Sequence, residues 1–358
     1  WARKTGKALW GVASGLAAGG ALLVRPLEGF TLGCLIGLWM LAGAGTLRWK
    51  AASLAAFAAG GMLLGVPTLY YNQLLTGDPL KFPIMAYTDK YYGPNSNALG
   101  FGPDRGLGWA IDPNPGHSPF DAMVNANLNM FSINIELFGW STGSLLLAAL
   151  FLLAAKLRRP DWLMLALSAA IFGVHFFYYF SGGPDFGARY WYLVLVPCVV
   201  FTIGGLDLLR ERLEAGSPDA GVRPVLAVLA LCGMAVINYF PWRAVDKYHH
   251  YEQMRPDVRS LAREHSFGRS LVLVQGDRHP DYASAAAYNP LDLAAGEPIY
   301  AWDRNSEVRR QVLEVYRDRP VWILEGPTRT GAGFRVKAGP LAASDLLPVA
   351  DGDPSAKQ

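Results

Sequence analysis

Seven long apolar stretches constrain this chain more than any other feature of its sequence. They cover residues 8–24, 30–47, 51–70, 139–155, 162–179, 191–209 and 224–240. Each is close to the roughly 17–25 residues that a helix needs to cross the hydrocarbon core of a bilayer. One such run could be a buried helix of a water-soluble protein, but seven in series predict an all-α polytopic transmembrane bundle. Gly and Ala are frequent in the first three stretches, which favours close approach of helix backbones in lipid.

The last third of the chain has a different character. After Trp242 charges are spread evenly and no apolar run is long enough to span a membrane. Apolar strands are predicted at 270–275, 298–302 and 320–324, with helices at 256–264 and from Asn305 or Ser306 to about residue 317. We therefore expect two domains: a bundle at 1–241 with a long loop at 71–138, and a small soluble α/β domain at 242–358. No Gly-rich phosphate loop follows these strands, so a Rossmann nucleotide site is not indicated.

Lysine and arginine predict the orientation of the bundle. They cluster before the first stretch and after the second, fourth and sixth (Arg3, Lys4, Lys7; Arg48, Lys50; Lys156, Arg158, Arg159; Arg210, Arg212, Arg223). If the spans alternate, all four clusters lie on one side, which the positive-inside rule makes cytoplasmic. The turn 25–29, the loop 71–138, the turn 180–190 and the C-terminal domain are then extracytoplasmic.

Charge, cysteines and motifs exclude several classes of protein. The net charge is only +3 and no dense Lys/Arg run indicates a nucleic-acid partner. Cys34, Cys198 and Cys232 each lie within an apolar stretch, which favours packing over a disulfide or a metal set. No Ser-His-Asp spacing, HExxH, Walker loop or CxxC pair is present. No cofactor is evident, although a divalent metal remains open. Asp277, His279 and Asp281 resemble a ligand cluster, but a polar loop after a strand is the favoured explanation.

The loop 71–138 is too long for a simple connection. Its Tyr, Pro, Gly and Asn content favours a folded or substrate-ordered loop over a solvated linker. Residues 118–137 carry apolar side chains at helical spacing: Phe120, Met123, Val124, Leu128, Phe131 and Ile135. This pattern predicts an amphipathic helix that lies either on the membrane surface or on its own loop.

Charged residues at the outer turns are the main functional candidates, because charge near a membrane is costly. Arg25 and Glu28 share the turn Arg-Pro-Leu-Glu-Gly, and Arg189 follows Asp185 in the turn FSGGPDFGARY. Two arginines on one rim suit a phosphate, because guanidinium pairs with phosphate bidentately. Alternatively, Arg25 pairs with Glu28 and Arg189 with Asp185 as interfacial anchors.

Two histidines remain to be placed. His117, in the loop segment NPGHSPF, is predicted to face solvent and is a candidate for substrate binding or proton transfer. His175, in VHFFYYF, is interpreted as a packed and hydrogen-bonded helix residue.

Several segments resemble a known family. They are GLAAGGALLVRPLEG; the loop sequence YNQLLTGDPLKFPIMAYTDKYYGP followed by LGFG, GH and NIELFGW; and FGARYWYLVLVP. These resemble polytopic glycosyltransferases of the GT-C class, including bacterial relatives of protein O-mannosyltransferases (family 39-like) and of the lipid A aminoarabinose transferase. The resemblance covers most of 8–209, and Ala188 stands where Pro is commoner.

The resemblance implies a function. Such enzymes take sugar from a polyprenyl-phosphate-linked donor and transfer it, on the extracytoplasmic side of the bacterial inner (plasma) membrane, to a lipid, glycan or protein acceptor. It implies that Arg25 and Arg189 hold the lipid phosphate and that the loop 71–138 closes over the donor. The neighbouring candidates for substrate binding are Glu28, His117, Asp185 and Tyr190.

The chain opens Trp-Ala-Arg-Lys, which we interpret as the start of a fragment. The resemblance places the family's catalytic acid in an earlier outer loop, so no catalytic base is assigned. Two other functions stay open: a transporter or flippase for lipid-linked glycans, and a non-catalytic assembly subunit. Transporters tend to show internal repeats and charges at the membrane midplane, whereas the charges here lie at the outer surface, which favours the transferase.

Overall fold

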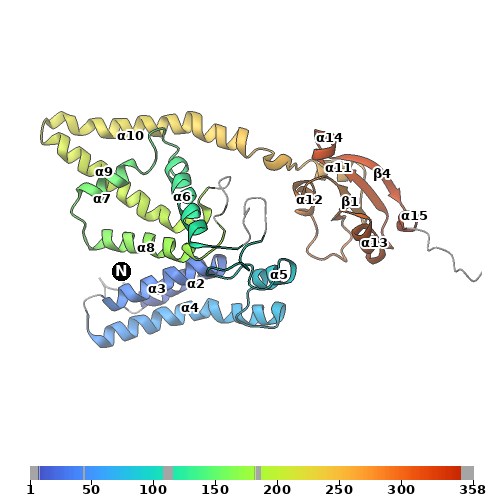
Figure 1. Ribbon diagram of the computed structural model, residues 1–358, viewed down its shortest axis with the longest axis horizontal. Helices are drawn as coiled ribbons and strands as arrows, with labels where there is room; N and C mark the ends of the chain where they lie inside the picture. The colour runs from blue at the N-terminus through green and yellow to red at the C-terminus, as the bar shows by residue number, and fades with distance from the viewer. Residues whose placement is uncertain are drawn as a thin grey trace, which may run out of the picture. The chain divides into compact units, whose positions relative to one another are not determined.

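The computed structural model describes residues 7, 9–42, 45–107, 116–180, 182 and 187–347. The chain divides into two compact units, Trp1–Phe240 and Pro241–Gln358. The first is helical, and the second contains a small sheet (Figure 1). The division falls next to the boundary expected from sequence, after residue 241.

Each of the seven apolar stretches overlaps helix in the first unit. Its elements are α2 (Leu9–Val24), α3 (Pro26–Ala42), α4 (Leu47–Thr76), α5 (Pro83–Tyr91), α6 (Pro119–Glu136), α7 (Leu146–Ala154), α8 (Arg159–Phe176), η2 (Arg189–Val194), α9 (Leu195–Glu214), η3 (Pro218–Gly221), α10 (Val222–Met234) and η4 (Ala235–Tyr239).

The number of spanning helices differs from the prediction of seven. Within the described part of the chain, three helices are long and apolar enough to cross a membrane: Leu47–Thr76, Arg189–Glu214 and Pro218–Gln253. α2 and α3 are apolar but have only 16 and 17 residues. At 1.5 Å per residue they fall short of a hydrocarbon core about 30 Å thick. The structure therefore supports a mostly helical protein with three candidate spans, and the count of seven is not supported.

The fourth predicted span departs furthest from expectation. Gly139 and Gly143, at the start of the apolar stretch 139–155, have φ values of +64° and +85°. Such a backbone cannot belong to a right-handed helix. α7 therefore begins only at Leu146 and has 9 residues.

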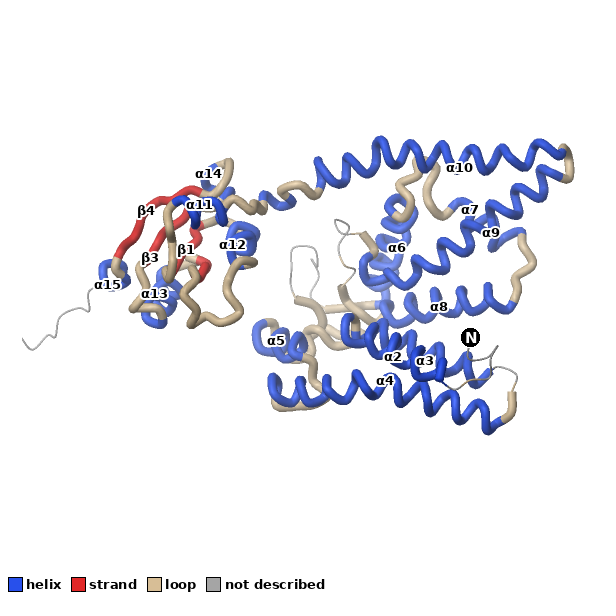
Figure 2. Tube along the Cα trace, turned by 180° about the vertical axis from the view of Figure 1, so that it is seen from behind, coloured by secondary structure: helices blue, strands red, loops and turns tan. Residues whose placement is uncertain are grey.

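Glycines set the packing of α2 against α4. Gly11, Gly15 and Gly19 recur every four residues along the face of α2 that meets α4. A Cβ on Gly15 would lie 2.0 Å from the backbone oxygen of Phe57, and a Cβ on Gly60 would lie 2.3 Å from that of Val12. The two helices thus touch backbone to backbone, and Figure 2 shows α2, α3 and α4 side by side. The predicted role of small residues is confirmed for this pair.

α8 packs against α3 and against the start of α9. Leu167 and Ile171 of α8 form a buried cluster with Trp191, Val194 and Cys198, and Leu32 and Leu35 of α3 pack against it. Ile171 is fully buried.

The second unit is an α/β domain, as predicted. Its elements are η5 (Trp242–Lys247), η6 (Tyr251–Gln253), α11 (Val258–Glu264), β1 (Leu271–Gln275), α12 (His279–Ala286), β2 (Ile299–Trp302), α13 (Ser306–Val315), β3 (Val321–Glu325), α14 (Pro327–Thr330), β4 (Arg335–Leu341) and α15 (Ala343–Leu346). The strand order is β2-β1-β3-β4, with β1 parallel to β2 and β3, and β4 antiparallel to β3.

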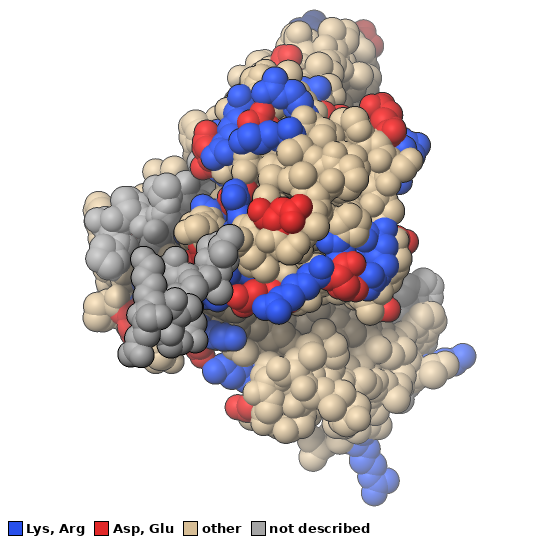
Figure 3. All heavy atoms as spheres, turned by 90° about the vertical axis from the view of Figure 1, so that its right-hand side faces the viewer, with Lys and Arg blue, Asp and Glu red and all other residues tan. Residues whose placement is uncertain are grey.

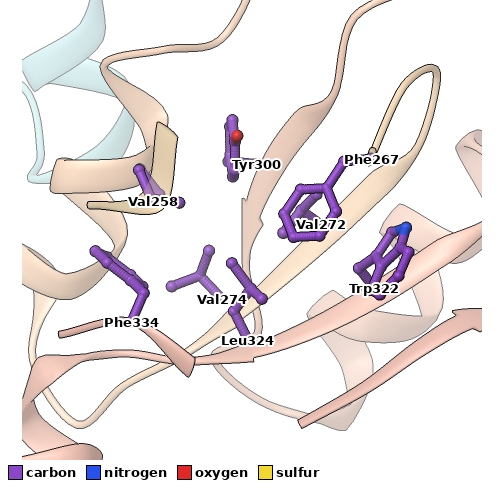
Figure 4. Packing of buried hydrophobic residues seen from close by; sticks show 9 residues of the cluster. Val258, Phe267, Val272, Val274, Tyr300, Trp322, Leu324 and Phe334 are labelled. Carbon is purple, nitrogen blue, oxygen red and sulfur yellow. The ribbon is translucent and has the colours of Figure 1, made fainter. Parts of the chain in front are cut away.

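Two cores lie on opposite faces of this sheet. Val272 and Val274 of β1 pack with Val258 of α11 (Figure 4). Ala285 of α12 belongs to the same cluster. Leu271 and Leu273, with the opposite parity, pack with Leu313 of α13. Because side chains alternate along a strand, a fully buried strand such as β1 must be covered on both faces.

The surface of this unit is charged with both signs. Arg310 pairs with Glu307 and Glu314, and Arg335 pairs with Glu325. Lys and Arg lie next to Asp and Glu in Figure 3. Such mixed charge is typical of a surface in contact with water.

The α2–α4 contact predicts opposite effects for two glycine substitutions. Gly15→Ala places a methyl group against the Phe57 backbone and should lower the thermal stability of the detergent-solubilised protein, at a cost of about 1–3 kcal/mol. Gly20→Ala, on the same helix, meets no atom within 4 Å. It should leave stability unchanged or raise it by up to about 1 kcal/mol, through helix propensity. Equal stability of the two variants would contradict the assigned packing.

Candidate functional site

Three segments far apart in the sequence meet at one end of the helices of the first unit. They are the turn between α2 and α3, the residues that end and follow α8, and the start of η2. Arg25 Nη1 lies 3.0 Å from Glu28 Oε1, so the predicted pairing within the first turn is formed. Gly29 makes this turn tight, because a Cβ there would lie 2.3 Å from the backbone nitrogen of Leu22.

Glu28 also faces a histidine that the sequence assigned only a packing role. His175 Nε2, in the last turn of α8, lies 3.6 Å from Glu28 Oε1. Only 6% of Glu28 and 7% of His175 are exposed. The expectation that His175 is packed is confirmed, but neither of its ring nitrogens has a hydrogen-bond partner in the described part of the chain. Its nearest charged neighbour is therefore a buried carboxylate.

Tyr190 brings the two candidate arginines together. The guanidinium carbon of Arg25 lies 4.8 Å from the centre of the Tyr190 ring, and that of Arg189 lies 5.3 Å from it. Attraction between a guanidinium and a ring face orients both groups. Gly182 gives the ring its room, because a Cβ at this position, where φ is +93°, would lie 2.7 Å from the Tyr190 ring. Arg25, Glu28, Arg189 and Tyr190 thus form one group, as the sequence suggested.

A layer of aromatic rings surrounds this group. The Tyr178 ring lies 6.1 Å from His175 and 6.0 Å from Tyr190, and Phe180 lies 5.7 Å from Tyr190. The Tyr178 hydroxyl donates a hydrogen bond to Asn97 Oδ1 in the long loop, at 3.0 Å. This bond ties the loop to the candidate site.

His117 does not face solvent, so that prediction is wrong. Only 4% of it is exposed, its Nε2 donates to the backbone oxygen of Phe176 at 3.1 Å, and its ring lies 5.2 Å from Phe101. The loop supplies a further anchor, because Gly100 N donates to the backbone oxygen of Phe177. His117 therefore fastens the loop to the end of α8 rather than reaching for substrate from the surface.

Local contacts hold other described parts of the long loop. Lys81 Nζ lies 2.8 Å from Asp89 Oδ2, and this hydrogen bond holds the pKa of Asp89 below its ordinary value. α6 begins with Ser118 and Asp121 in a capping box. Its apolar side chains Phe120, Met123 and Phe131 are exposed, whereas Asn129 and Ser132 are buried. The helix is confirmed, and its exposed apolar face favours the membrane-surface alternative.

Two further carboxylates are relevant to this site. Asp185, the candidate from the sequence, lies outside the described residues. Glu136, at the end of α6, places Oε2 within 2.3 Å of where a Cβ on Gly187 would stand, two residues before Arg189. The sequence analysis gave Glu136 no role. The segment NIELFGW contained it, but nothing in the spacing connected it with the later turn.

The polar cluster after β1 in the second unit is structural. Asp281 lies within α12 rather than in a loop, and only 1% of it is exposed. It accepts hydrogen bonds from the backbone nitrogen and the hydroxyl of Thr328. Among the residues that the structure describes, no group of three or more His, Cys, Asp or Glu side chains could hold a metal ion.

Comparison with family models, curated proteins and solved structures finds no significant match. The chemistry of the site must therefore be argued from its own residues. Two guanidinium groups face one ring, and the buried carboxylate of Glu28 pairs with one of them. Such a group suits an anion with several acceptor oxygens at the membrane surface.

The contacts of His117 predict that its loss frees the loop. His117→Ala should increase amide hydrogen exchange in residues 95–107 and 116–118, because the bond to Phe176 and the packing on Phe101 are removed, at a cost of about 1–3 kcal/mol. His249→Ala, at an exposed position outside the first unit, is the control and should leave this exchange unchanged. Unaltered loop exchange in His117→Ala would show that the loop is held by other contacts.

Proposed function

We propose that this protein is an inverting membrane glycosyltransferase that takes sugar from a polyprenyl-phosphate-linked donor and transfers it to a lipid, glycan or protein acceptor. The observation that carries the proposal is the group Arg25, Tyr190 and Arg189. In this group two guanidiniums from distant parts of the chain lie over one aromatic ring.

The charge of this group favours a phosphate ligand. Arg25 is about one-third exposed and is paired with Glu28, and the side chain of Arg189 is accessible to a ligand. The group therefore supplies guanidinium N–H donors from two separate segments of the chain. A phosphodiester carries one negative charge and presents several oxygens to guanidinium N–H donors. Neutralisation of this kind is what a lipid-linked phosphate requires at a membrane surface.

The positions of the basic clusters support an extracytoplasmic location for the site. Arg159 begins α8 and His175 lies in its last turn; Arg210 lies near the end of α9, whose first residue follows η2 and Arg189. The clusters and the site therefore lie at opposite ends of the same helices. By the positive-inside rule the site end faces outward. α2 and α3 join the membrane-embedded bundle in this proposal, because short apolar helices are accommodated by local thinning of the bilayer.

The long loop would cover the bound donor. His117 and the Gly100 backbone hold it against the end of α8, and Tyr178 connects it to the site through Asn97. A loop held at these points lies beside the proposed phosphate position. Exclusion of water from that position would strengthen the ion pairs with phosphate.

Binding of a polyprenyl phosphate tests the proposal. Arg25→Ala and Arg189→Ala should each weaken binding of polyprenyl monophosphate to the purified protein in nanodiscs by about 10- to 100-fold. This corresponds to one charge-assisted contact of about 1.5–3 kcal/mol. Arg25→Lys keeps the charge beside Glu28 and should lose less affinity than Arg25→Ala. The uncharged polyprenol should bind all these proteins equally.

Arg223→Ala is the matched control, because Arg223 is an exposed arginine beyond the far end of α9. It should bind as the unaltered protein does. Wild-type affinity in both Arg25→Ala and Arg189→Ala would refute the phosphate role. Specific binding together with no transfer to any lipid, glycan or protein acceptor would favour the transporter or the assembly subunit over the transferase.

A further inference from the structure

One carboxylate oxygen in the site has two cationic neighbours. Glu28 Oε1 lies 3.0 Å from Arg25 Nη1 and 3.6 Å from His175 Nε2. The first distance is a hydrogen-bonded ion pair. The second is just beyond a hydrogen bond, so a small movement of either side chain would close it. Arg25 and His175 therefore approach the same oxygen atom, which has acceptor positions for both.

His175 is buried, so a positive charge on its ring requires a nearby negative charge. The side chain is 95% buried, and no described residue accepts or donates a hydrogen bond at Nδ1 or Nε2. Among the described residues, the charged and titratable groups near it are Glu28 from α3, with Arg25 bound to that carboxylate, and Tyr178 and Tyr190 beyond the end of α8. A buried imidazolium is stable only where a negative charge compensates it. Glu28 is the carboxylate within reach.

A phosphate bound to Arg25 would change the charge balance around Glu28. The guanidinium would have to share its donors between Glu28 and the phosphate oxygens, and a strong phosphate contact draws it away from the carboxylate. Glu28, which is 6% exposed, would then be a buried anion short of a partner. Its remaining neighbour on the same oxygen is His175 Nε2. Protonation of that ring would restore the balance of charge.

We propose that His175 takes over Glu28 when Arg25 engages a phosphate, so that phosphate binding is coupled to the uptake of one proton by His175. This inference rests on the proposed function, because it requires a phosphate ligand at Arg25. His175 is then a positioning residue: it acts through Glu28 and makes no contact with the phosphate.

The second nitrogen of an imidazolium also needs an acceptor. His175 lines a cavity of about 10 Å³ together with Asn125, Asn129 and Tyr178. That volume is near the minimum for one water molecule, and a buried water needs two to four polar partners. The amide groups of the two asparagines, which each also donate one hydrogen bond to a backbone oxygen, belong to its polar lining, so the cavity suits a water that would accept the second N–H.

The sign of the pH effect follows from the coupling. Imidazole ordinarily titrates near pH 6.5. When a ligand binds together with a proton, affinity is high at low pH and falls as the pH rises above the titration of the free group, by at most tenfold per pH unit. A phosphomonoester would itself gain charge near pH 6 and obscure this trend. A polyprenyl methyl phosphodiester keeps one charge throughout and is the probe to use.

The test measures binding of this phosphodiester to the whole protein in nanodiscs between about pH 5.5 and 8.5, the range around imidazole titration. Affinity should fall with rising pH, and calorimetry in two buffers of different ionisation enthalpy should show uptake of up to one proton. His175→Gln should bind with a nearly flat pH profile. Glu28→Gln, which removes the shared carboxylate, should also abolish the pH slope and should bind more tightly at high pH. His249→Gln, far from the site in sequence and in the other unit, should keep the full slope.

The outcomes separate the two proposals. If none of the proteins binds the phosphodiester at any pH, the phosphate site fails and the coupling fails with it. If the unaltered protein binds with no pH dependence and no proton uptake, the phosphate site stands and the coupling is refuted. A slope retained in both His175→Gln and Glu28→Gln would likewise refute it. Two independent variants guard against the misfolding of either one.

Discussion

The side chain of Glu28 is buried at the start of α3, and its ionised form needs a compensating charge there. Arg25 supplies that charge from the preceding turn, and His175 approaches the same oxygen from α8. Arg25 in turn lies over Tyr190, which also lies beside Arg189. The positions of both arginines thus depend on one carboxylate and one ring. Glu28 therefore holds Arg25 beside the Tyr190 ring and also competes with a phosphate for its N–H donors.

Helix packing places these groups. Gly29 allows the turn after α2 to close, and the glycines of α2 allow it to lie against the backbone of α4. α3 packs against α8, whose last turn brings His175 to Glu28. The loop 71–138 meets the same end of α8 through His117 and Tyr178. Apart from the Gly29 turn, these contacts join segments that are distant in sequence, so the site is a product of the fold of the first unit rather than of any one motif.

The sequence predicted the parts of this arrangement that follow from composition and periodicity. Arg25 and Glu28 are three residues apart in a turn, and alternation of apolar stretches put Arg189 and Tyr190 on the same side. The sheet strands β1, β2 and β3 follow from short apolar runs. His175 was interpreted correctly as packed, but periodicity does not show which helix face meets a carboxylate. Seven spans were predicted from apolar length, which does not show the positive φ of Gly139 and Gly143 that shortens α7. His117 was wrongly predicted to face solvent, because the sequence of a polar loop does not show that this residue contacts Phe176.

The central claim is that a lipid phosphate is held between Arg25 and Arg189 beside the Tyr190 ring. The most direct measurement is an experimental structure of the protein in a lipid nanodisc with bound polyprenyl phosphate. We expect phosphate density within hydrogen-bond distance of guanidinium nitrogens of both arginines, next to Tyr190. Phosphate density elsewhere on the protein, with Arg25 and Arg189 in contact with protein carboxylates alone, would contradict it.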